Sequence, residues 1–205
     1  MVSQFSNPFY SIFAGEASHI YTSPPTLTAD LLQYALTADM DTEFRKLSAT
    51  TTTFKRSGND FTNAESPDMD AFKKRGGKLI IFNGGGDTAF SMNDVTAYYD
   101  KVSTRYGGVS QAQDFVRAFY VPGMSHCSGG AGSTDQFDAF GAVRKWAEDG
   151  VAPDAMVATA RAAAGSANPG RTRPLCSYPA EAIYNGTGDP EVASSFSCKV
   201  PAASL

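Results

Sequence analysis

The sequence predicts an α/β fold in which the central strands run parallel. Residues 78–82 form a nearly continuous apolar run, typical of a strand buried on both faces of a parallel sheet, and residues 115–121 form a second strand of this kind. A helical pattern follows each run, and glycine-rich loops lie directly after both of them. Strand, helix, strand and helix in this order indicate parallel neighbours joined by a crossover, which places the chain in the α/β class.

Helices are expected before and after these strands. The first, at residues 67–77, has basic residues in its last turn and ends in glycine, as the helix dipole and a left-handed cap favour. Ser91 is expected to cap the second helix, with Asp94 three positions on in a capping-box arrangement. The third is expected at residues 134–149, because large apolar residues recur there at intervals of three and Gly150 follows.

The two flanks of this pattern are expected to be irregular. Residues 1–75 show no clear core of their own and at most a short helix or turn at residues 26–34. Regularity fades again after residue 165. A disulfide between Cys176 and Cys198, which enclose 21 residues, would stabilise this tail by about 3 kcal/mol.

Composition excludes several classes of partner. The 205 residues include 17 Lys and Arg against 21 Asp and Glu, a net charge of −4, and the basic residues are scattered rather than clustered. We therefore expect no nucleic acid as a partner. No run approaches the roughly 18 apolar residues that cross a bilayer, so no membrane partner is expected either. The first residues lack the basic start and apolar run of a signal peptide, so any export signal would lie outside this sequence.

Two histidines limit where imidazole chemistry can occur. His19 lies in the irregular aromatic stretch and is assigned a structural or surface role. His126 follows the second strand, and Asp87 follows the first through three glycines that are expected to let the backbone turn sharply. Loops at this end of the strands carry the sites of open α/β folds.

An aspartate and a histidine so placed can act together. The carboxylate fixes the tautomer of the imidazole, whose other nitrogen then serves as a general base. The order Asp87 before His126 fits the last two members of the α/β-hydrolase order of nucleophile, acid and histidine. The alternative is that Asp87 merely caps the following turn and His126 is a satisfied loop residue. Spacing alone does not choose between these readings.

A nucleophile is not evident. The sequence contains no Gly-x-Ser-x-Gly, and the nearest approach, residues 123–127, has Cys127 in place of the second glycine and leads into a loop. Ser125 is therefore a poor candidate. A further alternative is a cytosolic hydrolase with Cys127 as the nucleophile, but sequence neighbours such as Cys127 and His126 rarely point at one another in the geometry required.

No metal or cofactor motif is complete. Asp39, Asp41 and Glu43 alternate as calcium ligands do, but no glycine follows at the turn position and Thr50 stands where a closing Glu is needed. A solvated acidic turn is the favoured reading. The glycines at residues 84–86 lack the Lys and Ser or Thr of a phosphate loop. We expect no cofactor in this chain.

Several segments, in order, resemble the C-terminal part of the tannase and feruloyl esterase family, which includes tannases, feruloyl esterases and a mono(2-hydroxyethyl) terephthalate hydrolase. Residues 13–17 resemble the stretch where the family's lid rejoins the core. The remaining segments that carry the resemblance are residues 72–81, 86–87, 115–117, 121–127, 146–154 and 171–179.

The resemblance implies a serine esterase that is secreted or periplasmic and cleaves esters of aromatic acids such as gallate or ferulate by a Ser-His-Asp mechanism. Asp87 and His126 match the family's acid and base. The fold implied is a partial α/β-hydrolase: residues 1–65 as the end of the lid and a connecting segment, and residues 66–205 as the C-terminal part of the catalytic domain with a disulfide-stapled tail.

The family's remaining parts are expected outside this sequence. Its nucleophilic Ser, oxyanion hole, most of the lid and the calcium site belong to the N-terminal half, and Asn83 stands where many members have His. Cys127 matches the cysteine that pairs with one beside the nucleophile, so its partner would lie outside this chain, whereas Cys176 and Cys198 match the C-terminal pair. The implied partners are a small aromatic ester and the N-terminal half of the same enzyme.

Two further expectations follow. A chain without the nucleophile could instead be a catalytically inactive binding or structural module. A half sheet of about three strong strands would also leave an apolar strand edge open, so the chain alone is expected to aggregate or to depend on a partner segment.

Overall fold

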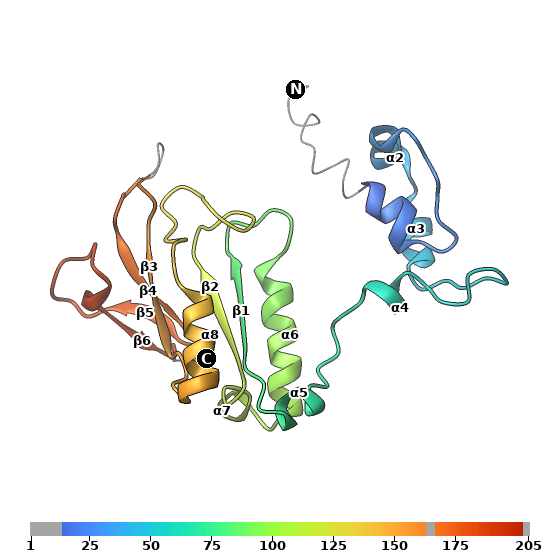
Figure 1. Ribbon diagram of the computed structural model, residues 1–205. Helices are drawn as coiled ribbons and strands as arrows, with labels where there is room; N and C mark the ends of the chain where they lie inside the picture. Colours follow the sequence, from blue (N-terminus) through green and yellow to red (C-terminus); the bar gives the residue numbers. More distant parts are fainter. Residues whose placement is uncertain (1–13, 163–166, 203–205) are drawn as a thin grey trace. The chain divides into compact units, whose positions relative to one another are not determined.

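The computed structural model describes residues 14–162 and 167–202 (Figure 1). Two compact units make up the chain, Met1–Glu65 and Ser66–Leu205. Phe13, the first residue of the motif at residues 13–17, lies outside the described residues. None of the helices in the described ranges is long and apolar enough to cross a membrane.

The first unit contains more helix than the sequence predicts. Asp30 and Asp39 each cap a short helix, accepting hydrogen bonds from the backbone N–H groups of Gln33 and Asp41. Such short helices have little apolar periodicity, which is why the sequence indicated only one of them. The elements are a π-helical turn η1 (Ala17–Tyr21) and the helices α2 (Leu31–Thr37), α3 (Met40–Lys46) and α4 (Asn59–Thr62).

The three acidic residues at positions 39, 41 and 43 form the cap and first turn of α3, not the solvated turn that the sequence favoured. Glu43 accepts hydrogen bonds from Lys46 Nζ at 2.7 Å and from the Tyr34 hydroxyl at 3.0 Å. Burial alone would raise the pKa of Glu43, but these bonds and one from Thr26 outweigh it and lower that pKa. Across residues 14–162 and 167–202, no group of three His, Cys, Asp or Glu side chains is placed to hold a metal ion.

The second unit contains the predicted parallel pair. Strands β1 and β2 pair in parallel with Leu79 opposite Val116 and Gly84 opposite Val121, which confirms the α/β prediction. The elements in order are α5 (Asp70–Lys74), β1 (Leu79–Gly84), α6 (Met92–Arg105), α7 (Val109–Ala112), β2 (Val116–Val121), α8 (Ala139–Asp149), β3 (Ala155–Thr159), β4 (Thr172–Cys176), β5 (Glu181–Tyr184) and β6 (Phe196–Lys199).

Strand β2 is the centre of the core. Val116 and Ala118 pack with residues of α6, whereas Phe119 and Val121 pack with residues of β3 and β4, and all four are fully buried. Strand β1 is only partly covered, and Phe82 is 44% exposed. The first strand, predicted to be buried on both faces, is thus only partly buried: Leu79 and Ile81 pack against one core cluster and Ile80 against the other. Among the described residues β1 pairs with β2 alone.

Helix α6 begins directly after Ser91, which caps it as predicted, whereas the other two predicted helices begin later than expected. Helix α8 starts at Ala139, where Asp138 accepts a hydrogen bond from the Gly141 N–H, because Gln136 instead forms an antiparallel bridge with Thr159. Its end is as predicted, with Gly150 in the left-handed conformation at φ 73°. Likewise α5 occupies only the middle of the helix predicted at residues 67–77.

The tail is more regular than predicted. Strand β4 pairs antiparallel with β3, and β5 pairs antiparallel with β6 (Figure 1). These strands have four or five residues each, and β4 contains Pro174, so neither length nor alternation marked them in the sequence. The disulfide between Cys176 and Cys198 is confirmed and joins β4 to β6.

Candidate active site

The loops after β1 and β2 are joined to one another by backbone hydrogen bonds. The Gly85 N–H donates to the Val121 carbonyl at 3.0 Å, and the Gly86 N–H donates to the Met124 carbonyl at 2.9 Å. A Cβ atom on Gly84 would collide with the Met124 carbonyl oxygen. Residues 84–87 form the turn that the sequence suggested, with the Asp87 N–H donating to the Gly84 carbonyl at 3.3 Å, although none of the three glycines has a positive φ. Close backbone approach is the reason for a glycine at position 84.

This joining brings Asp87 and His126 together. Asp87 Oδ2 lies 3.0 Å from His126 Nδ1, and the two side chains are 2% and 30% exposed. The other carboxylate oxygen, Oδ1, accepts from the backbone N–H groups of Ala89 at 2.8 Å and Phe90 at 3.0 Å. The two readings left open by the sequence are therefore not exclusive, because one oxygen caps the turn while the other contacts the histidine.

The environment keeps Asp87 ionised. Burial by itself would raise the pKa of the carboxyl group. The hydrogen bonds from the Phe90 N–H, the His126 ring and the Ala89 N–H stabilise the charged form and together outweigh burial, so the pKa of Asp87 is lowered. A carboxylate in this state accepts a hydrogen bond from Nδ1–H and so fixes the imidazole tautomer.

The turn that carries His126 is short and exposed. Ser125 closes it, its N–H donating to the Gly129 carbonyl at 3.1 Å. Cys127 has a left-handed backbone with φ 65°, and its thiol is exposed and outside any disulfide of this chain. The Phe90 ring, itself exposed, lies beside the imidazole with 5.3 Å between ring centroids. No pattern in the sequence predicts this contact, because the two rings are brought together only by the folded loops.

A buried carboxylate that the sequence missed also contacts this turn. Asp135, predicted to lie within a helix, precedes α8 and accepts a hydrogen bond from the Gly129 N–H at 2.6 Å. Arg161 donates through Nε to the same oxygen at 2.6 Å. Neither residue belongs to a recognisable motif, so no pattern in the sequence pointed to the pair.

His19 lies in the other compact unit. Its Nε2 atom is 3.2 Å from the Thr28 carbonyl oxygen and 3.3 Å from the Thr28 backbone nitrogen. This contact with the main chain agrees with the structural role assigned from the sequence.

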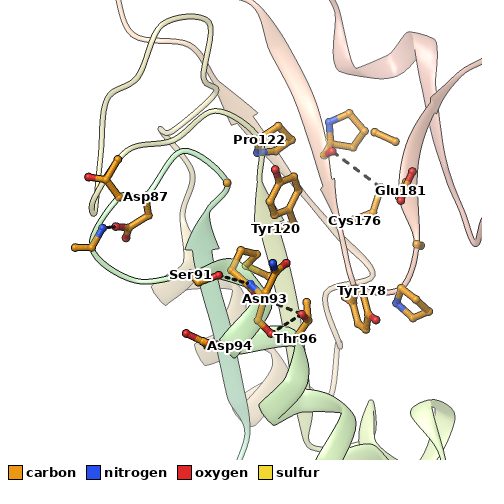
Figure 2. A pocket seen from close by; sticks show the side chains of 18 residues that line it. Asp87, Ser91, Asn93, Asp94, Thr96, Tyr120, Pro122, Cys176, Tyr178 and Glu181 are labelled. Atoms are coloured by element: carbon orange, nitrogen blue, oxygen red, sulfur yellow. Dashed lines mark hydrogen bonds between the residues drawn. The ribbon is translucent and has the colours of Figure 1, made fainter. Parts of the chain in front are cut away.

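A cavity of about 840 Å³ lies beside Asp87 (Figure 2). The start of α6, the end of β2 and the β4–β5 region enclose it, with Tyr120, Pro122 and Tyr178 among its walls. Asp87 lines this cavity, but His126 does not. Asp87 is thus the member of the pair that borders this cavity.

The sequence is similar to those of esterases. The family described as tannase and feruloyl esterase matches residues 7–199. The chain is 42% identical over 169 residues to the mono(2-hydroxyethyl) terephthalate hydrolase of Piscinibacter sakaiensis, covering 80% of this chain and 26% of that protein. It is 36% identical over 151 residues to a probable feruloyl esterase of Arthroderma benhamiae, covering 71% and 27% of the two chains.

Solved structures give a similar fold. Feruloyl esterase B from Aspergillus oryzae matches with a TM-score of 0.60 at 22% identity, over 90% of this chain and 36% of that one. The tannin acyl hydrolase of Aspergillus niger matches with a TM-score of 0.53 at 21% identity, over 84% and 29%. The chain spans about a quarter of the length of the curated relatives named above.

Proposed function

Because the chain belongs to the tannase and feruloyl esterase family, we propose that it supplies the acid and the base of a serine esterase. The observation that carries this proposal is the 3.0 Å contact between Asp87 Oδ2 and His126 Nδ1, at the carboxyl ends of two adjacent parallel strands. Its position agrees with the last two members of the hydrolase order of nucleophile, acid and histidine.

In the proposed reaction, Asp87 holds the proton on Nδ1, so that Nε2 of His126 is the basic nitrogen. A serine from a segment outside these 205 residues attacks the ester carbonyl while Nε2 takes its proton. The imidazolium then returns a proton to the departing alcohol, and Asp87 stabilises the positive charge in between. Water repeats the sequence on the acyl-enzyme and releases the acid.

The proposed substrates are esters of aromatic acids such as gallate or ferulate. Two relatives carry the names of such activities, a terephthalate monoester hydrolase and a feruloyl esterase. The exposed Phe90 ring next to His126 supports this substrate class, because an aromatic acyl group gains from contact with such a ring.

The proposed partner is the N-terminal part of the same enzyme. Within the described residues β1 has no strand on its outer edge, and an uncovered edge of this kind can pair with a further strand. Phe82 on β1 is 44% exposed, and Phe140 on α8, which lines the same small cavity, is 77% exposed. We propose that the partner segment covers this edge, brings the serine and pairs a cysteine with Cys127.

The proposed compartment is oxidising, extracellular or periplasmic. The Cys176–Cys198 disulfide supports this, because such bonds persist where thiols are not kept reduced. No cofactor enters the proposed reaction.

A chimera tests the function. The N-terminal part of the Piscinibacter hydrolase is joined to this chain, and release of p-nitrophenol from a p-nitrophenyl ester and of gallate from methyl gallate is followed. We expect turnover by the chimera and none after His126→Ala. Turnover that survives His126→Ala would refute the assignment of the base. A folded chimera that binds aromatic esters without cleaving them would favour the inactive binding module instead.

A further inference from the structure

Residues 125–129 form the turn that carries His126, and three hydrogen bonds that fix this turn meet at Gly129. Its carbonyl accepts the Ser125 N–H at 3.1 Å and the Ser133 hydroxyl at 2.8 Å. Its own N–H donates to Asp135 Oδ2 at 2.6 Å. His126 lies between Ser125 and Gly129, so the backbone that carries the imidazole is closed by bonds that meet at this one residue.

Side-chain packing contributes little to this turn. Cys127 and Ser128 are exposed, and the neighbouring Gly130 has a φ of 103° and no side chain. A segment without packed side chains has few other constraints, so its position depends on its hydrogen bonds. The bond from the Gly129 N–H to Asp135 links the backbone of this turn to a buried carboxylate.

Asp135 is itself firmly anchored. Its side chain is 1% exposed, and Arg161 donates to the same Oδ2 atom at 2.6 Å. The next residue, Gln136, forms two backbone hydrogen bonds with Thr159 at the end of β3, at 3.1 and 2.9 Å. Asp135 is thus fixed to the end of β3 through Gln136 and is not part of the turn to which it is hydrogen-bonded.

The carboxylate of Asp135 is charged in this environment. Burial would raise its pKa, but the bonds from the Gly129 N–H and the Arg161 guanidinium, with the positive charge of Arg161, outweigh burial and lower it. A hydrogen bond between an ionised acceptor and a backbone N–H is about twice as strong as a neutral one.

We propose that Asp135, supported by Arg161, is a positioning residue that sets the orientation of the His126 ring toward Asp87 by fixing Gly129. Asp87 contacts the ring itself, but the ring reaches Asp87 only if the backbone of the turn is in place. Calling His126 the base rests on the proposed function, whereas the link from Asp135 to the turn does not depend on it.

Nuclear magnetic resonance of the histidine rings tests the link in the 205-residue chain. The chain has two histidines, so ¹⁵N labelling of histidine gives two sets of ring signals, and His19 in the other unit serves as an internal reference. A protected Nδ1–H signal reports the bond to Asp87, and Asp87→Ala defines its loss.

Asp135→Ala removes the acceptor for Gly129, and we expect the His126 Nδ1–H signal to be lost as in Asp87→Ala. Asp135→Asn keeps a neutral acceptor oxygen, so the signal should be retained. Glu191→Ala removes another Arg–carboxylate pair, Arg171–Glu191 at 2.5 Å in the same unit, and should leave the signal unchanged. A folded Asp135→Ala chain with unchanged His126 signals would overturn the proposal, and so would Asp135→Asn behaving as Asp135→Ala.

If Asp135→Ala does not fold, Arg161→Ala is the alternative test. Arg161 is exposed, so we expect its replacement to leave the fold intact. The substitution leaves the Gly129 bond but removes the support of the carboxylate. We expect Nδ1–H exchange to be at least fivefold faster, and an unchanged rate would count against the proposal.

The chimera adds a kinetic readout. Asp135→Ala should lower kcat by about 10- to 100-fold with KM within twofold, since small displacements of a reacting group cost rate rather than binding, and Asp135→Asn should recover most of it. A KM change without loss of kcat would contradict positioning. A chimera that is inactive before any substitution would count against the proposed function, while the ring signals would still decide the role of Asp135.

Discussion

Asp87→Asn is the substitution whose outcome depends most directly on the geometry of the site. The asparagine is isosteric, and its amide oxygen keeps the bonds from the Ala89 and Phe90 N–H groups if it takes the position of Oδ1. The amide NH₂ then faces His126 Nδ1 across the 3.0 Å contact. A donor at that position favours a lone pair on Nδ1 and moves the proton to Nε2, which is the wrong tautomer for a base.

The expected effect on rate is large. The Asp87 side chain is 2% exposed, so water has little access to replace the lost acceptor. Loss of the correct tautomer in a serine hydrolase triad costs on the order of 10⁴-fold in kcat, the magnitude known from chymotrypsin-type proteases. In the chimera, we expect Asp87→Asn to lower kcat for a p-nitrophenyl ester by about this factor with little change in KM.

The same substitution has a pH signature. The pKa of Asp87 is lowered in the folded chain, so the unfolded chain binds more protons and stability rises with pH through this range. The contribution of Asp87 is present above its ordinary value of 3.8 and is lost as pH falls through the lower folded value. Asp87→Asn should therefore flatten the acid limb of a plot of the unfolding midpoint against pH.

Asp149→Asn is the matched control, since this carboxylate is exposed at the end of α8 and should leave both kcat and the acid limb unchanged. Activity of Asp87→Asn within tenfold of the unsubstituted chimera would refute the reasoning, because Asp87 would not then set the tautomer.

Three further outcomes are expected. Replacing Cys176 and Cys198 by serine should cost about 3 kcal/mol in the free energy of unfolding, measured by urea denaturation under non-reducing conditions, and an unchanged midpoint would show that the bond does not constrain the unfolded chain. Gly84→Ala should cost about 2 kcal/mol, because its Cβ meets the Met124 carbonyl, and a thermal midpoint equal to that of the parent would contradict this close approach. Cys127 is the exposed thiol outside the disulfide, so iodoacetamide should add one label per native chain by mass spectrometry, and zero or three labels would refute the assignment.

The local features of the sequence determined the elements around the site. The apolar run before Gly84 and the strand before Pro122 predicted two parallel strands, and the glycines between β1 and Asp87 marked the loop. Those signals are short-range, since strand burial and chain reversal depend on neighbouring residues. The placement of Asp87 and His126 at one sheet edge follows from parallel pairing, so the sequence could anticipate it.

The strands of the C-terminal tail could not be predicted from local sequence patterns. Strands β3 to β6 are too short to alternate visibly, and they exist because antiparallel partners and the Cys176–Cys198 disulfide hold them together. The partial exposure of β1, where Phe82 is 44% exposed, could not be predicted from the sequence either, because the same apolar run is typical of central and edge strands alike.

Only the tertiary structure decided how the site is held. Asp87 and His126 are 39 residues apart in the chain. One oxygen of Asp87 contacts the imidazole and the other accepts a hydrogen bond within the turn, and the spacing of residues in the sequence does not predict this arrangement. Asp135 was assigned to a helix, yet it lies before the helix and meets Arg161, 26 residues later in the chain. The sequence by itself therefore determined which residues arrive at the edge of the sheet. The contacts between distant segments determined their orientation, because hydrogen-bond geometry is fixed by all the backbones that meet there.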